Sequence, residues 1–398
     1  MKISLRWLSR HVDLSGIDPR QILADLTMST AEIEDLIRFG DGLEPLVVGH
    51  VRKREKHPDA DKLSVCEVDL GDSGGVVQIV CGAPNVDAGQ RVVVIKPGDV
   101  LPPSGGKGAL KIKVGKIRGV ESHGMICSES ELGLSEEADG IFVLPADAAI
   151  GARFVDVCEV QDWVFEIDNK SINHRPDLWG HYGFARELAA IYGRELKPAV
   201  VPAALPDDGA GVEGIIEAQA ACPRDCGLMI DGVTSGPSPN ELRWQLQAVD
   251  QRAINLPVDL TNFVMLDLGQ PMHAFDSRHI GDASIRVRRA KDGEAITTLD
   301  GQERKLDDQD LLICAGDKPE ALAGVMGGEG TMVEAGTTSL FLESANFRAS
   351  TIRRTTMRLG LRTDASTRFE KAQDPKNAET AVHYFLQLLR EHCPTAAA

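Results

Sequence analysis

Residues 63–82 read LSVCEVDLGDSGGVVQIVCG, two β-rich runs separated by a turn of Gly, Asp and Ser. Alternating or continuous apolar residues bounded by such turns are typical of short strands. Outward from this pair lie three similar runs, VVGHV at 47–51, RVVVI at 91–95 and LKIKVGKI at 110–117. Five short strands in one region predict a small closed barrel, for which an OB-fold is the natural candidate.

Helices are predicted on both sides of this barrel. Residues 19–28 follow an Asp-Pro pair, which favours a helix start. Residues 178–192 form a second helix, which Asp177 caps and Gly193 ends. Its apolar face consists of Leu178, Tyr182, Ala185, Ala189 and Tyr192.

An α+β domain is predicted after a linker containing Pro and Ala at 197–211. A capping box at 238–241 starts one helix, and a second helix starts after Asp259 and ends at Gly269. The strand-like runs are SIRVRRA, EAITTL, LLICAG and TSLFLESANF, with a Gly-rich turn, AGVMGGEG, before the last run and an Arg-rich helix, TIRRTTMRLG, after it.

The composition is that of a chain with several globular domains. With 398 residues, of which 42% are hydrophobic and 26% charged, about two to four domains are expected. No apolar run approaches the roughly 18 residues of a membrane span. Charges interrupt the N-terminal stretch MKISLRWLSRHVDL, where a signal peptide has an apolar core. We therefore expect a cytoplasmic protein without a membrane partner.

The eight cysteines are spread along the chain, and only Cys222 and Cys226 lie close together. No second pair of Cys or His stands at the spacing of a zinc site. Reduced, mostly buried thiols and no metal site are therefore expected.

The net charge of −17 argues against indiscriminate binding to nucleic acid, DNA included, because an acidic molecule repels phosphates over about a Debye length. Basic residues nevertheless gather at 50–62 and at 107–118. Each stretch is either a solvated surface or part of a specific RNA site.

One histidine stands in an apolar run, LTNFVMLDLGQPMHAFD at 260–276. A histidine flanked like His273 is more often a core residue bonded to a backbone carbonyl than a chemical group. The segment QPMHAF is expected in the loop that leaves the preceding helix, where irregular backbone can line a pocket. On the residues alone, both interpretations of His273 stay open.

Several longer motifs resemble the β subunit of bacterial phenylalanyl-tRNA synthetase. They are MKISLRWLSR, HPDADKLSVCEVDLG, VCGAPNV, ESHGMICSESELGL, NHRPDLWGHYGFARELAAIYG and ASTRFEKAQDP. The resemblance covers the whole chain but only about the N-terminal half of such a subunit, so the chain is either a fragment or a naturally short relative.

The resemblance implies an α+β multidomain protein in which an OB-fold barrel is inserted in a small α/β domain and an α+β editing domain follows. The expected boundaries are 1–39 and 151–196 for the split N-terminal domain, 40–150 for the tRNA-binding barrel, 197–211 for the linker and 212–398 for the B3/B4-type editing domain.

The implied activity is hydrolysis of Tyr wrongly attached to phenylalanine tRNA. An apolar pocket shaped for Phe rejects Tyr only weakly, whereas a site that binds the phenol can select Tyr strongly. The matching motifs assign His273, Asn262 and Thr261 to the water and ester carbonyl, and Glu343 to the Tyr hydroxyl. The remaining pocket residues are Arg252, Pro271, Gly327, Thr363 and Ala365. No nucleophilic triad or metal cluster is visible, which favours hydrolysis by a positioned water.

The resemblance also implies partners. These are an α subunit in an α2β2 heterotetramer and phenylalanine tRNA, which we expect to contact Lys111, Lys113 and Lys116 on the barrel. ATP and Mg²⁺ are expected for the holoenzyme and no cofactor on this chain. Two alternatives stay open: a stand-alone tRNA hydrolase acting in trans, and a non-catalytic tRNA-binding protein, which the intact set of pocket residues disfavours.

Overall fold

The computed structural model describes residues 1–398 except 105–107, 137–139, 202–204, 206–211 and 282–283. The chain divides into two units that alternate along the sequence. The first consists of Met1–Leu36, Phe165–Leu242 and Ala253–Ala398, and the second of Ile37–Val164 and Arg243–Arg252.

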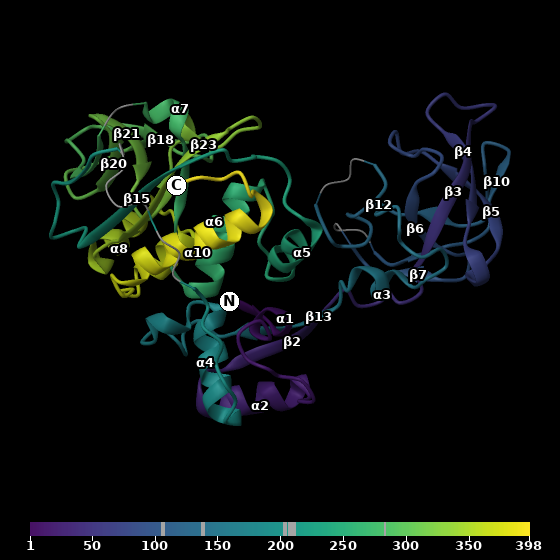
Figure 1. Cartoon of the computed structure of the whole chain (residues 1–398), viewed down its shortest axis with the longest axis horizontal. Coiled ribbons are helices and arrows are strands. Elements are labelled where there is room, and N and C mark those ends of the chain that lie inside the picture. The colour runs from purple at the N-terminus through teal and green to yellow at the C-terminus, as the bar shows by residue number, and fades with distance from the viewer. Residues whose placement is uncertain (105–107, 137–139, 202–204, 206–211, 282–283) are drawn as a thin grey trace. The chain divides into compact units, whose positions relative to one another are not determined.

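The second unit is built around a curled sheet of six strands (Figure 1). In order these are β11 (Met125–Ile126), β6 (Arg91–Ile95), β3 (Val47–Lys56), β4 (Ser64–Asp69) and β5 (Val76–Cys81), and β12 (Val143–Leu144) also pairs with β6. The edge strands β11 and β5 contact each other. The backbone N–H of His123 donates to the carbonyl of Gln78 at 2.8 Å. The sheet therefore nearly closes into the predicted OB-type barrel.

Short elements complete the barrel unit. They are the hairpin strands β7 (Val100–Leu101), β8 (Leu110–Lys111), β9 (Gly115–Ile117) and β10 (Val120–Ser122), with the helices η1 (Gly71–Ser73) and α3 (Phe154–Cys158). The barrel interior is tightly filled at Gly49, where an added Cβ would lie 2.7 Å from Val68 Cγ1 and 2.8 Å from Val94 Cγ2. Only a residue without a side chain fits between these valines.

The first unit begins with a small sheet made from both sides of the barrel segment. Its strands β1 (Lys2–Ser4), β13 (Asp162–Ile167) and β2 (Ile33–Phe39) lie in the order β1-β13-β2. The helices of this part are α1 (Leu5–Leu8), α2 (Pro19–Ser29), η2 (Pro176–Leu178) and α4 (His181–Tyr192). Asp18 caps α2 by accepting a hydrogen bond from the backbone N–H of Arg20, which confirms the predicted helix start.

The predicted cap at Asp177 is wrong. Helix α4 starts only after Gly180, and the carboxylate of Asp177 instead pairs with the guanidinium groups of Arg175 and Arg186. Charge-assisted bonds to two arginines outcompete a single bond to a backbone N–H. The helix ends as predicted at Gly193, which adopts the left-handed conformation of a C-cap.

The rest of the first unit contains two larger sheets. One has the order β14 (Gly214–Ile216), β17 (Ile285–Arg289), β20 (Leu311–Ala315), β21 (Lys318–Leu322) and β22 (Met326–Gly327). The other has the order β15 (Arg224–Asp231), β23 (Ser339–Asn346) and β16 (His273–Asp276), and β18 (Ala295–Thr297) pairs separately with β19 (Glu303–Lys305). The helices are α6 (Leu256–Leu268), α7 (Ser277–Ile280), η3 (Glu329–Thr331), α8 (Ala349–Leu359), α9 (Asp364–Phe369) and α10 (Asn377–His392). Helix α5 (Asn240–Ala248) falls mostly in the second unit, which includes Arg243–Arg252.

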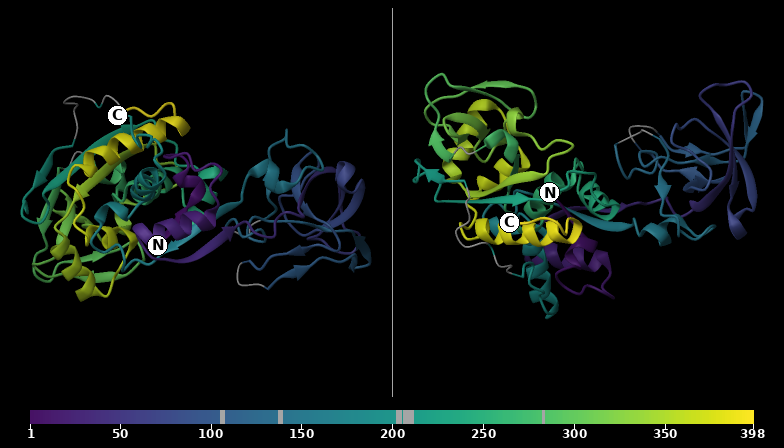
Figure 2. Two further views of the ribbon diagram at one scale, coloured as in Figure 1. Left: turned by 90° about the horizontal axis from the view of Figure 1, so that it is seen from below. Right: turned by 45° about the horizontal axis from the view of Figure 1, so that its top comes forward.

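These two sheets share one apolar core. Phe275 of β16 and Phe341 of β23 belong to the same buried cluster as Val287 of β17 and Ile313 of β20. Helix α10 contacts β15, β23 and α6 and lies along the three-stranded sheet in both views (Figures 1 and 2). Alternate residues of β15 and β23 therefore face either the shared core or α10.

The hydroxyl of Ser238, which belongs to the predicted capping box, donates to the carboxylate of Asp259 at 2.5 Å, and α5 starts at Asn240. The second predicted helix start in this part is wrong. Helix α6 starts at Leu256 rather than after Asp259, since Asn255 caps it by accepting a hydrogen bond from the N–H of Val258. The Arg-rich helix is confirmed as α8, and the four predicted strands correspond to β17, β18, β20 and β23.

Candidate functional site

Glu343 lies at the centre of the three-stranded sheet. On β16 its directly paired residue is His273, and on β15 it is Gly227. Directly paired residues of antiparallel strands point to the same face. Glu343 and His273 therefore share the face on which Phe341 and Phe275 join the core, and Gly227, on the other side of Glu343, is covered by the ring of Phe341. The predicted loop position of His273 is wrong, since it is the first residue of β16.

His273 is half-buried. Its ring packs edge-on against Phe275, with 4.4 Å between the ring centroids. Nε2 is buried and has no hydrogen-bond partner. Burial lowers the pKa of His273 from 6.5 to about 4, so the ring is neutral at neutral pH. A neutral imidazole with an unpartnered ring nitrogen is able to accept a proton from a bound water.

Gly327 covers the ring of His273. A Cβ at this position would lie 2.5 Å from Cε1 and 2.7 Å from Nε2 of the imidazole. The carbonyl of Gly327 accepts a hydrogen bond from the N–H of Leu299 at 3.0 Å, which fixes this backbone in place. The structure thus brings together His273, Glu343 and Gly327, three of the residues assigned to the pocket.

The carboxyl group of Glu343 is buried without compensation. The residue is 5% exposed, and within the described ranges no hydrogen bond or ion pair reaches its side chain. Burial, followed by the nearby charge of Asp225, raises the pKa of Glu343 well above its usual value. A buried polar group without a partner is costly, and a ligand with a matching polar group relieves that cost.

Thr261 and Asn262 lie on α6, which contacts β16. The hydroxyl of Thr261 donates to the carbonyl of Val258 at 2.7 Å, so its proton is already engaged. Asn262 is half-buried, and no described residue forms a hydrogen bond with its side chain. Of the two, only Asn262 therefore has a free side-chain donor. Pro271, also buried, follows α6 and accepts a hydrogen bond from the amide of Gln270 at 3.0 Å.

Thr363 and Ala365 lie at the start of α9. The hydroxyl of Thr363 donates to the carbonyl of Val325 at 2.8 Å and accepts from the N–H of Ser366 at 3.1 Å, as part of a capping box. This contact ties α9 to the segment just before Gly327. Ala365 is half-buried and packs against the shared core. Arg252, in contrast, is exposed and falls in the segment that belongs to the barrel unit, so the structure does not group it with these residues.

Two neighbours of Glu343 were missed by sequence reasoning. Gly227 and Asp225 lie on β15, whose sequence RDCGLMID lacks the clear alternation of a strand. The Oδ1 atom of Asp225 is buried without a hydrogen-bond partner. An isolated Gly in a possible strand, which often marks a close approach, was the available signal. Phe341 makes that approach, since a Cβ on Gly227 would lie 2.6 Å from its ring.

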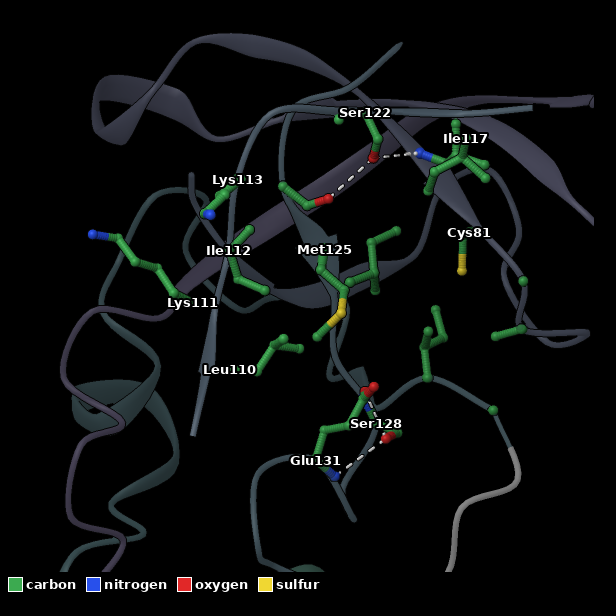
Figure 3. Close-up of a pocket in the computed structure, with 18 of the residues that line it drawn as sticks. Cys81, Leu110, Lys111, Ile112, Lys113, Ile117, Ser122, Met125, Ser128 and Glu131 are labelled. Carbon is green, nitrogen blue, oxygen red and sulfur yellow. Dashed lines mark hydrogen bonds between the residues drawn. The ribbon is translucent and has the colours of Figure 1, made fainter. Parts of the chain in front are cut away.

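The barrel unit has a cavity of about 600 Å³. Its lining is mostly aliphatic and contains Cys81, Ile112, Ile117 and Met125 (Figure 3). No aromatic residue is found among the described residues that line it. Glu131 accepts hydrogen bonds from the backbone and the hydroxyl of Ser128, each at 2.8 Å, at one side of the cavity.

The lysines assigned to tRNA binding lie beside this cavity. Lys111 and Lys113 belong to its lining, and the side chain of Lys111 extends away from Met125 (Figure 3). Lys116 lies on β9 outside the lining, and its Nζ is 3.6 Å from the carboxylate of Glu121. Two of the three lysines therefore belong to the lining of this cavity.

The remaining features of the chain concern its thiols, possible metal ligands and helix lengths. All eight cysteines are free thiols. Within the described ranges, no three His, Cys, Asp or Glu side chains converge as metal ligands would. Over the same ranges, no helix is both long and apolar enough to cross a membrane.

Comparison with known proteins shows which families this chain is similar to. Residues 46–153 match the family described as putative tRNA binding domain, and residues 221–394 match the B3/4 domain family. The chain is 43% identical over 392 residues to the phenylalanine–tRNA ligase β subunit of Desulfotalea psychrophila, which covers 98% of this chain and 47% of that protein. It is 45% identical over 395 residues to the β subunit of Nitratidesulfovibrio vulgaris, with coverages of 98% and 48%.

The chain thus spans about half the length of the curated relatives that it matches. The two domain families occur in the order predicted from the sequence, and the identity extends along nearly the whole chain. The chain belongs to the family of phenylalanine–tRNA ligase β subunits.

Proposed function

We propose that this chain is the part of a phenylalanine–tRNA ligase β subunit that hydrolyses Tyr-tRNA formed in error on phenylalanine tRNA. The observation that carries the proposal is the position of the buried carboxyl group of Glu343 directly opposite His273 on the neighbouring strand. Such a site offers one buried polar partner for a phenol next to one neutral imidazole. A Phe ester leaves the carboxyl group of Glu343 unpaired, so this site favours Tyr.

The reaction assigns a different task to each group. A water held near Nε2 of His273 attacks the ester carbonyl and gives its proton to the imidazole. The side-chain amide of Asn262 is suited to donate to the oxyanion, and Thr261, whose proton is engaged, is suited to orient the water as an acceptor. The C–O bond to the tRNA ribose then breaks, and the ribose oxygen takes up the proton. Pro271, Thr363 and Ala365 are assigned to the wall of the pocket.

The wider role follows from the family. We infer that the chain acts with an α subunit, in an α2β2 assembly, in the cytoplasm. Attachment of Phe, with ATP and Mg²⁺, is assigned to the α subunit, and Arg252 to the tRNA end. Copurification of a tagged α subunit with the full-length gene product tests this division of labour, and a chain that acts alone in trans is contradicted by a stable complex.

The editing site is tested by the hydrolysis of purified Tyr-tRNA. Glu343→Ala is expected to reduce hydrolysis by about 1–3 kcal/mol of transition-state stabilisation, because the phenol loses its buried partner. His273→Ala is expected to slow the same reaction. Asp231→Asn, an exposed change on β15, serves as the control. Equal hydrolysis by all variants would contradict the assignment, as would a parallel loss of Phe attachment by the holoenzyme.

The barrel supports a second task, which is tRNA binding. Lys111 and Lys113 beside the 600 Å³ cavity favour it, because an anionic backbone and an adjacent base can use both features. This task complements ester hydrolysis by raising the local concentration of the substrate.

A further inference from the structure

Two acidic side chains face the shared core from neighbouring strands. Asp225 of β15 pairs with Ala345, and Gly227 pairs with Glu343 of β23. Asp225 is thus the diagonal neighbour of Glu343 on the same face. The residues paired with these two are Ala345, which has only a methyl group, and Gly227, over which the ring of Phe341 packs.

No positive charge compensates this pair. Arg224, next in sequence to Asp225, points to the other face of the sheet, where its guanidinium pairs with Glu379 of α10. Within the described ranges, no hydrogen bond or ion pair reaches the side chain of Asp225 or Glu343, and Oδ1 of Asp225 is buried. Two carboxylates placed so close in an apolar surrounding cannot both be ionised at low cost.

The other titratable groups near the pair are uncharged or turned away. His273 of β16 stands opposite Glu343 and is neutral. The thiol of Cys222 lies before β15 and donates to the carbonyl of Arg224 at 3.3 Å, and burial raises its pKa. Cys226 follows Asp225 on β15, so its side chain points to the opposite face of the sheet. Burial raises the pKa of the Cys226 thiol as well. The two carboxyl groups therefore respond mainly to burial and to each other.

We propose that Asp225 is a positioning residue for the editing site, whose negative charge keeps the carboxyl group of Glu343 protonated at neutral pH. A protonated carboxyl group donates one hydrogen bond and accepts another, and so matches both the oxygen and the proton of a phenol. The pair shares a single proton until the pH is high enough to ionise both groups. The selection of Tyr by this route rests on the proposed editing function.

The directions of the pKa values agree with this assignment. Burial raises the pKa of Asp225 to about 6, and burial with the charge of Asp225 raises the pKa of Glu343 well above its usual value. The proposal places the negative charge on Asp225 and the remaining proton on Glu343. Removal of the charge of Asp225 lowers the pKa of Glu343, so Glu343 ionises at lower pH.

The test is Asp225→Asn, which removes the charge and keeps the shape. We measure the ratio of hydrolysis of Tyr-tRNA to Phe-tRNA as a function of pH, with Asp231→Asn on the same strand as the matched control. In the unmodified chain the ratio falls where Glu343 ionises. In Asp225→Asn this fall is expected at lower pH by about one unit or more, the scale on which a close charge acts. In a Glu343→Gln background, Asp225→Asn is expected to leave the pH profile unchanged.

A second measurement needs no tRNA. The carbonyl stretch of a protonated, buried carboxyl group is followed by infrared difference spectroscopy during a pH titration. The Glu343 signal, identified by its loss in Glu343→Gln, is expected to disappear at lower pH in Asp225→Asn than in the unmodified chain. Thermal unfolding checks the fold, and Asp225→Asn is expected to be at least as stable because an uncompensated buried charge is removed.

Different results would contradict the role of Asp225 and the editing function. Superimposable pH profiles and infrared titrations of Asp225→Asn and the unmodified chain overturn the role of Asp225 while leaving the editing function intact. A lack of Tyr-tRNA hydrolysis in the unmodified chain, together with a shifted infrared titration, contradicts the editing function and supports the coupling of Asp225 to Glu343.

Discussion

At the scale of single residues, the site depends on positions that lack a side chain as much as on those that have one. Gly227 and Gly327 have no Cβ, which lets the rings of Phe341 and His273 pack directly against their backbones. The resemblance assigned Gly327 on the basis of its motif, whereas Gly227 became visible only through its pairing with Glu343. Register between strands is a long-range property, and one sequence without clear alternation does not reveal it.

The substitution Gly327→Ala tests this packing. Because the new Cβ would lie 2.5 Å from Cε1 of His273, the ring must move or the backbone must shift. Overpacking of this kind costs about 1–3 kcal/mol of stability, and a displaced imidazole is expected to slow Tyr-tRNA hydrolysis. Gly214→Ala, where the added Cβ meets nothing within 4 Å, is the control in thermal unfolding and activity measurements. A fully active, equally stable Gly327→Ala would contradict the contact.

At the scale of elements, one buried carboxylate joins three parts of the first unit. Asp267 near the end of α6 accepts hydrogen bonds from the hydroxyl of Tyr384 of α10 at 2.7 Å and lies 2.8 Å from Nε2 of His11, which follows α1. Burial acts to raise the pKa of Asp267, but the contacts with His11 and Tyr384 lower it below its usual value. The carboxylate therefore remains charged while fully buried.

We expect Asp267→Ala to lower the free energy of unfolding by about 3–5 kcal/mol, the usual effect of breaking a buried charged network. Tyr384→Phe removes one hydrogen bond to the carboxylate and is expected to cost about 1.5–3 kcal/mol of the free energy of unfolding.

The direction of the pKa shift of Asp267 also predicts how the stability of the fold depends on pH. A lowered pKa of Asp267 stabilises the fold above its unfolded value of 3.8, and this contribution is lost as the pH falls through the folded value. Urea unfolding of both variants measures these losses, and an Asp267→Ala chain as stable as the unmodified one would contradict the network.

The elements also show what the sequence could predict. Strands with regular apolar alternation, such as β4 and β5, and helices with local signals, such as α2 and α8, were predicted correctly. An error arose where other side chains engage the residue expected to cap a helix, as Arg175 and Arg186 do with Asp177. Local rules do not include such competition.

At the scale of the whole molecule, charge is distributed unevenly. The chain carries −17 overall, yet Lys111 and Lys113 lie together beside the barrel cavity. The sign of the local charge determines where on the surface an RNA can bind. The negative net charge weakens binding of RNA to the rest of the surface.

Charge reversal at Lys111 and Lys113 is therefore expected to weaken tRNA binding and to reduce the slope of log affinity against log salt by about one unit for each lost phosphate contact. The exposed Lys291, in the other unit, provides the control Lys291→Glu. Binding is measured by fluorescence anisotropy across a salt series. Curves that superimpose for the reversed and unmodified chains would place the RNA elsewhere on the barrel.

The β1-β13-β2 sheet has a consequence for how the chain folds during synthesis. The amino group of Met1 donates to the carbonyl of Ile167, 166 positions later in the chain, and His11 meets Asp267 only 256 positions later. Domains generally fold as units while the chain emerges from the ribosome. The barrel, whose strands all lie between these partners, is able to complete its own pairing first. Met1 and His11, which are made before the barrel, are then able to complete these contacts only after Ile167 and Asp267 have been made.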